Sequence, residues 1–148
     1  MMHMEIKLRA IDRSLWEACC ALKVSEGQRK FVAANAYSLV QAAYEPDTFP
    51  MGILADGALA GFVMYDFDGD ANLWNMCRLM VDEKHQKKGI GEKAIRLLLA
   101  YVTARHGHVE FHTSAEPENE VAIALYERMG FEKTGEMVFG EVDLKIQL

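Results

Sequence analysis

Apolar and polar residues follow two different rhythms in the first third of the chain. Residues 5–10 alternate one by one, which is typical of a half-buried strand. A polar residue, Asp12 or Ser14, can cap a helix that runs to about Leu22. A second helix is expected over residues 28–43, where apolar residues recur at helical spacing. The pattern therefore predicts one strand followed by two helices.

Three strands are expected next. Pro46 and Pro50 interrupt the helical pattern. Residues 51–55 and 59–66 then read as strands on either side of an Asp-Gly pair, which is a strong hairpin signal. Residues 73–81 form the third expected strand, after a turn that contains Gly and Asp.

Helical spacing returns in the second half of the chain. The elements expected there are a helix at 89–104, a strand at 109–113, a helix at 118–129, and two strands at 131–139 and 142–147. The complete order is β-α-α-β-β-β-α-β-α-β-β, which predicts a mixed α/β layer architecture. A length of 148 residues fits a single domain over residues 1–148.

Composition narrows the setting in which we expect the protein to work. No apolar run resembles a secretory signal or reaches the roughly 20 residues of a membrane span, so we expect a cytoplasmic protein with no membrane partner. The three cysteines are odd in number and include no C-x-x-C pair, which argues against a disulfide framework and a structural zinc site. We therefore expect no metal.

Charge is distributed unevenly along the chain. The net charge of −6 argues against nucleic acid as a partner. Residues 31–77 contain six acidic residues and no Lys or Arg. The basic residues Lys84, Lys87, Lys88 and Lys93 cluster further along. This asymmetry indicates two ligand regions of opposite sign, although both segments also fit ordinary solvated surface.

The basic cluster coincides with a predicted strand-to-helix junction. Backbone N–H groups in the first turn of a helix lack intrahelical partners and bind anions together with the helix dipole. Gly89 and Gly91 remove side chains that would keep a phosphate away from this backbone, and Gln86 can hydrogen-bond the loop or the anion. The segment has neither a Walker loop nor a Rossmann fingerprint. By itself it predicts an anion site.

Two segments resemble motifs of the GNAT superfamily of N-acetyltransferases. Gln86-x-x-Gly89-x-Gly91 is similar to the Q/R-x-x-G-x-G/A motif of that superfamily. Residues 119–131, NEVAIALYERMGF, are similar to its N-x-x-A-x-x-L-Y-x-x-x-G-F motif. The element order also matches along nearly the whole chain. The resemblance implies the GNAT fold, with a mixed, mostly antiparallel central sheet of about seven strands and helices on both faces.

The resemblance also implies that acetyl-CoA is the cosubstrate. The residues expected to bind it are Leu79, Met80 and Val81 at the pantetheine arm, and Gln86, Lys87, Lys88, Gly89, Ile90 and Gly91 at the pyrophosphate. Asn119 would contact the cofactor arm, and Tyr126 would act as the catalytic acid that protonates the leaving thiolate. Read without the resemblance, Asn119 is an N-cap and Tyr126 an aromatic on a packed helix face.

The base that prepares the acceptor amine is left open by the sequence. An aliphatic amine is mostly protonated near neutral pH and must lose a proton before it attacks. Some members of the superfamily carry a glutamate on the strand before the phosphate loop, whereas residues 73–78 contain no carboxylate. Candidates are water molecules held by Asn75 or His112 and carboxylates of the acidic stretch; His112 also fits a packed or exposed histidine.

Within the superfamily, the chain most resembles bacterial spermine/spermidine acetyltransferases of the compact type. The similarity lies in residues 24–28 (VSEGQ), 61–65 (GFVMY) and 78–82 (RLMVD). It implies that the acceptor is a small cationic amine, a polyamine or diamine, bound by the acidic part of the chain. The first candidates among these acids are Glu26, Glu45 and Asp47.

Two other functions are compatible with these motifs. The acceptor can be another small amine, such as an amino acid, amino sugar or antibiotic. The domain can also be an acyl-CoA-binding module without transfer activity, although the presence of Asn119 and Tyr126 speaks against this.

The terminal hairpin is a candidate homodimer contact through Met137, Val138 and Phe139.

Overall fold

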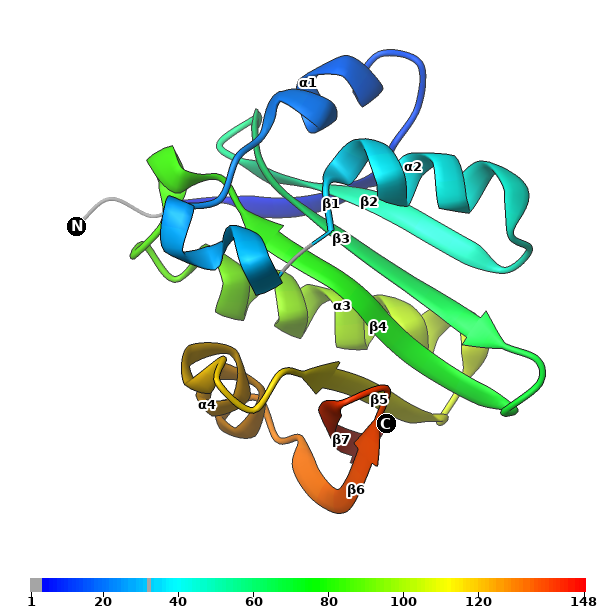
Figure 1. The fold of residues 1–148 in the computed structure, drawn as a ribbon. Helices are drawn as coiled ribbons and strands as arrows, with labels where there is room; N and C mark the ends of the chain where they lie inside the picture. The colour runs from blue at the N-terminus through cyan, green and yellow to red at the C-terminus, as the bar shows by residue number, and fades with distance from the viewer. Residues whose placement is uncertain (1–3, 32) are drawn as a thin grey trace.

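The computed structural model describes residues 4–31 and 33–148. Across these residues the centre of the fold is a seven-stranded sheet with the order β1-β2-β3-β4-β5-β7-β6 (Figure 1). The strands are β1 (Ile6–Ala10), β2 (Thr48–Ala55), β3 (Ala58–Asp68), β4 (Leu73–Val81), β5 (Glu110–Ala115), β6 (Glu132–Val138) and β7 (Glu141–Gln147). Among them only β4 and β5 pair in parallel. The prediction of a mixed, mostly antiparallel sheet is confirmed.

Helices cover both faces of the sheet. They are α1 (Trp16–Ala21), η1 (Glu26–Phe31), α2 (Asn35–Tyr44), η2 (Glu83–His85), α3 (Ile90–His106) and α4 (Glu120–Arg128), where η marks a 3-10 turn. Neighbouring strand residues point to opposite faces. On β3, Phe62 and Met64 accordingly pack with Cys19 of α1, whereas Val63 and Tyr65 pack with α3. None of the described helices is long and apolar enough to span a bilayer.

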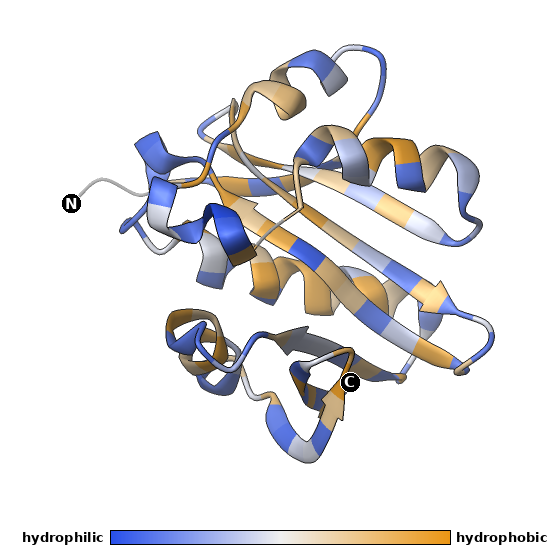
Figure 2. Ribbon diagram, in the orientation of Figure 1, coloured by the Kyte–Doolittle hydropathy of each residue, from blue (hydrophilic) through white to orange (hydrophobic). Residues whose placement is uncertain are grey.

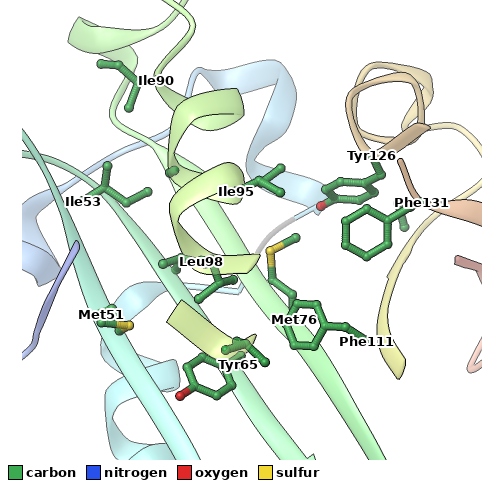
Figure 3. Close-up of a cluster of buried hydrophobic side chains, with 14 of the residues drawn as sticks. Met51, Ile53, Tyr65, Met76, Ile90, Ile95, Leu98, Phe111, Tyr126 and Phe131 are labelled. Atoms are coloured by element: carbon green, nitrogen blue, oxygen red, sulfur yellow. The ribbon is translucent and has the colours of Figure 1, made fainter. Parts of the chain in front are cut away.

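The larger core lies between the sheet and the helices α3 and α4. Hydrophobic residues run along the central strands and α3 (Figure 2). In this core, Ile95 of α3 lies near Tyr126 of α4, and Phe131 lies beside the Tyr126 ring (Figure 3). The ring centroids of Tyr126 and Phe131 are 5.9 Å apart. This packing holds the second sequence motif against the sheet.

The helix predicted over residues 28–43 is wrong in its first half. Residues Glu26–Phe31 form the 3-10 turn η1, and α2 begins only at Asn35; residue 32 lies outside the described residues. The amide of Asn35 donates a hydrogen bond to the carbonyl of Cys19 at 2.9 Å. This contact with α1 anchors the start of α2, and local spacing does not reveal it.

Pro50 lies inside β2, although the sequence pattern predicts that it precedes the strand. β1 pairs with β2 only as far as Met51, so no residue of β1 requires an N–H group from Pro50. The carbonyl of Pro50 instead accepts a hydrogen bond from the N–H group of Ile11 at 3.1 Å. The proline therefore sits where β2 has a ladder on one side only.

Candidate active site

A cavity of about 800 Å³ lies where β4 and β5 part. These parallel strands pair at three positions, from Trp74 with Phe111 to Met76 with Thr113. Beyond Met76, the remainder of β4 forms one wall, and the end of β5 with α4 and the start of β7 forms the other. The start of α3 closes one end. The volume falls within the range of small-molecule sites.

The start of α3 offers unpaired backbone donors to this cavity. Gly89, Ile90 and Gly91 are among the lining residues, and no side chain caps the helix. Gly89 has φ +76°, a conformation that glycine adopts at little cost, and a β-carbon built there meets nothing within 4 Å. Free N–H groups and open space fit a phosphate group.

Gln86 holds the loop that precedes α3. Its Nε2 donates to the carbonyl of Val81 at 2.9 Å and to Oε1 of Gln28 at 2.8 Å. The neighbouring Asp82 carboxylate accepts a hydrogen bond from the backbone N–H of Lys23 at 2.9 Å. Gln86 therefore ties the loop to β4 and η1, and Gln28 is a supporting residue that no sequence motif indicated.

A bulge shapes the β4 wall of the cavity. The register between β3 and β4 shifts so that Met64 is paired with Arg78 and Tyr65 with Met76. Cys77 consequently has no paired residue on β3. Cys77 and Arg78 consequently both line the cavity. Leu79, Met80 and Val81 continue this wall, as the motif resemblance implies for an edge that meets the pantetheine arm.

Tyr126 projects from α4 into the opposite wall. Its side chain is buried, and burial raises the pKa of the phenol to about 12. The hydroxyl of Thr113 acts in the opposite direction, and the Glu141 carboxylate raises this pKa further. The phenol is thus protonated at any ordinary pH and is available as a donor.

Asn119 caps α4 at the edge of the same cavity. Its side-chain oxygen accepts a hydrogen bond from the backbone N–H of Ala122 at 3.4 Å. The residue also lines the cavity. Asn119 therefore combines the helix-capping position with the location implied for a residue that contacts the cofactor arm.

The residues predicted to bind the amine are scattered. Asn75 lines the cavity. Glu26, Glu45 and Asp47 are exposed and do not belong to the described cavity wall, so the structure does not bring these three acids together with the site. Glu26 lies on η1, and Glu45 and Asp47 lie in the turn between α2 and β2.

His112 has a packed environment. Its Nδ1 lies 3.1 Å from Asp143 Oδ1, and its Nε2 lies 2.8 Å from Glu110 Oε1. The described lining of the cavity does not include His112, and neither does it include Lys88. The alternative reading of a packed histidine therefore fits this environment.

Other cavity residues were not predicted from the sequence. They include Arg78, Thr113, Ser114 and Glu141. Arg78 is held by α2, since its Nε donates to Ser38 at 3.2 Å and its Nη2 to Gln41 at 3.1 Å. Ser114 and Glu141 come from different strands, 27 residues apart in the sequence, and only the pairing of β5 with β7 brings them together. No local motif signals this contact.

The comparison with protein families identifies this arrangement. Residues 11–131 match the model described as the acetyltransferase (GNAT) family. The chain belongs to this family. GNAT acetyltransferases use acetyl-CoA, which confirms the predicted cosubstrate and the acyltransferase class. Among the described residues, no group of three or more His, Cys, Asp or Glu side chains is arranged to hold a metal ion.

Similar proteins cover nearly the whole GNAT domain. This chain is 29% identical over 143 residues to the spermine/spermidine N(1)-acetyltransferase of Bacillus subtilis (strain 168), and the match covers 92% of this chain and 93% of the relative. The spermidine N-acetyltransferase of Vibrio cholerae, solved with CoA and spermine, has a TM-score of 0.74 at 16% identity. The match covers 97% of this chain and 94% of that structure. An aminoglycoside acetyltransferase solved with coenzyme A has a TM-score of 0.79 at 18% sequence identity. The match covers 97% of this chain and 95% of that structure. These two likenesses establish the shared fold.

Proposed function

We propose that this GNAT protein transfers the acetyl group of acetyl-CoA to a primary amine of a polyamine or diamine such as spermidine or spermine. The observation that carries the substrate class is the 29% identity, over 92% of the chain, with a spermine/spermidine N(1)-acetyltransferase. The net charge of −6 supports a cationic acceptor, since an acidic protein raises the local concentration of polycations.

In this proposal, the cavity holds the cosubstrate along β4. The backbone of Leu79, Met80 and Val81 pairs with the pantetheine arm. The segment Gln86–Gly91 holds the pyrophosphate at the uncapped start of α3. Lys87 lies in the cavity wall and adds positive charge, whereas Lys88 contributes from outside it. Asn119 contacts the arm from the start of α4.

Tyr126 completes the transfer step. The neutral amine nitrogen attacks the thioester carbonyl and the carbon–sulfur bond breaks. The nitrogen loses one proton and the sulfur gains one, so that the products are an amide and the CoA thiol. A phenol with a pKa of about 12 is a donor at every working pH. Proton transfer from it to a thiolate, whose conjugate acid has a pKa of about 8.5, is uphill. Tyr126 therefore acts chiefly by donating a hydrogen bond to the sulfur.

The other reactive side chain in the wall supports direct transfer. Burial raises the pKa of the Cys77 thiol to about 12, the Asp66 carboxylate adds to this effect, and Arg78 opposes it. The thiol donates to the carbonyl of Met64 at 3.4 Å. A thiol held in its neutral form is a poor nucleophile. An acetylated cysteine is thus not a favoured intermediate.

Release of CoA in the presence of different amines tests the proposal. Purified protein with acetyl-CoA should release CoA above background with spermidine, spermine or putrescine. The panel should also contain amino acids, amino sugars and aminoglycosides. Activity confined to a monocationic amine would overturn the polyamine assignment. Binding of CoA by calorimetry without turnover on any amine would point to a non-catalytic acyl-CoA-binding module.

Aminoglycosides are a second candidate acceptor. The chain shares its fold with an aminoglycoside acetyltransferase at 18% identity, and this likeness concerns the fold rather than the acceptor. Both acceptor classes carry several positive charges, so charge alone does not separate them. The ratio of kcat/KM for spermidine and for an aminoglycoside decides between the two.

We further propose that the β6–β7 hairpin mediates a homodimer. Met137 is 56% exposed and Phe139 is fully exposed. Large exposed apolar side chains that lie together mark interaction surfaces. Sedimentation of the wild type and of Phe139→Ser should give a dimer and a monomer respectively; a monomeric wild type would refute the assignment.

A further inference from the structure

Glu141 occupies a cavity position that the proposed function leaves without a role. It is the first residue of β7 and pairs with Val138 across the tight turn of Phe139 and Gly140. Its side chain is partly buried and lines the cavity between β4 and β5. A carboxylate in such a position loses hydration and therefore needs a partner.

Ser114 fixes one oxygen of this carboxylate. The Ser114 hydroxyl donates a hydrogen bond to Glu141 Oε1 at 2.7 Å, and Ser114 also lines the cavity. Within the described part of the chain, Glu141 has no Lys or Arg within salt-bridge distance, and no residue donates to its second oxygen. The carboxylate is thus held in one orientation with an oxygen free to accept.

The carboxylate lies within electrostatic reach of the transfer step. Glu141 and Tyr126 line the same cavity, and the Glu141 carboxylate is one of the groups that raise the pKa of Tyr126, after burial of the phenol. In the proposed transfer step Tyr126 meets the leaving sulfur, so a ligand bound to Glu141 would share the cavity with the reacting thioester.

The other charged residues of the wall are less suited to a cation. Glu92 stands in the first turn of α3 and its carboxylate lies 3.8 Å from the Arg96 guanidinium. Arg78, Lys87 and Arg128 are themselves positive. Glu116 lies in the segment between β5 and α4 and has no hydrogen bond to fix its carboxylate among the described residues. Glu141 combines negative charge with a fixed orientation in the cavity that Tyr126 also lines.

We propose that Glu141, oriented by Ser114, binds the ammonium group of the acceptor amine in the transfer cavity. This inference rests on the proposed acetyl transfer to an amine and names the residue that recognises a positively charged nitrogen of the acceptor. The nitrogen that attacks must itself be neutral when it does so. It assigns the acceptor seat to the start of β7, in place of the outward-facing acids Glu26, Glu45 and Asp47.

Steady-state kinetics of Glu141→Gln test this assignment. The substitution keeps the shape and the Ser114 hydrogen bond but removes the charge. A lost hydrogen bond to a charged group corresponds to about a 10- to 100-fold change, so the KM for the amine should rise by about that factor. The KM for acetyl-CoA and the melting temperature should stay near the wild-type values. Glu136→Gln, at an exposed position of β6, is the control with the same loss of charge.

Two further variants separate recognition from folding. Glu141→Asp keeps the charge and should recover part of the lost affinity. Ser114→Ala frees the carboxylate and should raise the KM for the amine by less than Glu141→Gln does. An unchanged KM for the amine in Glu141→Gln, or an equal rise for the amine and acetyl-CoA, would overturn the inference.

The design distinguishes failure of this inference from failure of the proposed function. If the wild type acetylates a different amine, the same variants are measured with that amine. If no amine is acetylated, dialysis of spermidine against wild type and Glu141→Gln in the presence of CoA measures binding directly. Measurable and equal binding to both proteins refutes the role of Glu141, whereas no binding of spermidine to the wild type refutes the polyamine assignment.

Discussion

Tyr126 shows how one side chain can belong both to the core and to the site. Its ring packs against Phe131 in the larger core, while the residue also lines the cavity. The two descriptions that the sequence allows, an aromatic on a packed helix face and a hydrogen-bond donor in the site, are compatible in the structure. Core packing is what holds the phenol in a fixed orientation.

Replacing Tyr126 by Phe tests the donor role. Tyr126→Phe retains the ring and should lower kcat by about 100-fold, because the hydroxyl that meets the leaving sulfur is lost. The KM for acetyl-CoA should change little. In the wild type, kcat should not fall through phenol ionisation below about pH 10, because the pKa of Tyr126 is raised to about 12. Tyr37→Phe, on the exposed face of α2, is the matched control, and a kcat unaffected in Tyr126→Phe at every pH would remove the role.

Asp66 is a residue at which burial opposes stability. Burial, helped by the nearby Asp68, raises the pKa of its carboxyl group, while Arg78 and Asn75 lower it. Its Oδ1 is buried without a hydrogen-bond partner among the described residues. Since the folded state holds this proton more tightly than the unfolded state, the group favours folding at low pH. That contribution is lost as the pH rises through the folded-state pKa.

Asp66→Asn should therefore stabilise the protein near neutral pH. The gain in unfolding free energy should be at most about 1 kcal/mol, because the residue is only partly buried and solvent screens its charge. The gain should shrink as the pH falls and disappear well below about pH 4, where the carboxyl group is protonated in both states. Urea denaturation at the two pH values measures this, with exposed Asp70→Asn as the control. A stability loss that is the same at both pH values would contradict the explanation.

At the scale of elements, the site depends on how closely β3 approaches β4. A β-carbon on Gly61 of β3 would lie 2.5 Å from the carbonyl oxygen of Met80 in β4. A backbone atom in a sheet cannot move aside as a side chain can. Glycine at this position therefore allows the end of β4 to reach the start of the loop around Gln86.

Gly61→Ala should push β4 away from β3. We expect a loss of about 2 kcal/mol of unfolding free energy, in the range of overpacked cores, together with a higher KM for acetyl-CoA. Chemical denaturation and steady-state kinetics measure the two effects. Gly69→Ala is the control, since a β-carbon there meets nothing within 4 Å. Wild-type stability in Gly61→Ala would show that the two strands tolerate a larger separation.

At the scale of the whole molecule, acidic and basic residues occupy different parts of the chain. Six acids and no Lys or Arg occupy residues 31–77, and the net charge is −6. Although Glu45 and Asp47 lie outside the cavity, their field acts over distances up to the Debye length, about 10 Å at 0.1 M salt. These acids can therefore attract a polycation without contacting it.

The KM for spermidine should accordingly rise with ionic strength. At saturating acetyl-CoA, raising the salt concentration from about 0.1 M to about 1 M shortens the Debye length to about 3 Å and weakens attraction to the acidic surface. The effect should be larger for spermidine than for a singly charged amine. A KM that is independent of salt for both amines would show that distant charges do not contribute.

The sequence by itself determined the order of the strands and main helices and pointed to the family, although it missed the 3-10 turn at Glu26–Phe31. Sequence prediction succeeded where a few consecutive residues are enough to specify a turn or the start of a helix. Asp56 and Gly57 adopt φ values of +49° and +84° in the β2–β3 hairpin, as the Asp-Gly pair predicts. Gly89 takes its left-handed conformation at the start of α3. Such features depend on residues that are neighbours along the chain, so they can be recognised there.

The tertiary structure alone decided which polar residues share the cavity. The contact of Ser114 with Glu141 depends on the pairing of β5 with β7, and the exposure of Glu45 and Asp47 depends on where the end of α2 points. Linear charge density marked residues 31–77 as acidic but did not state which carboxylates face inward. The physical reason is that a sheet brings together residues that are distant in sequence. The face to which their side chains point follows from the pairing register of the strands, and local composition does not specify that register.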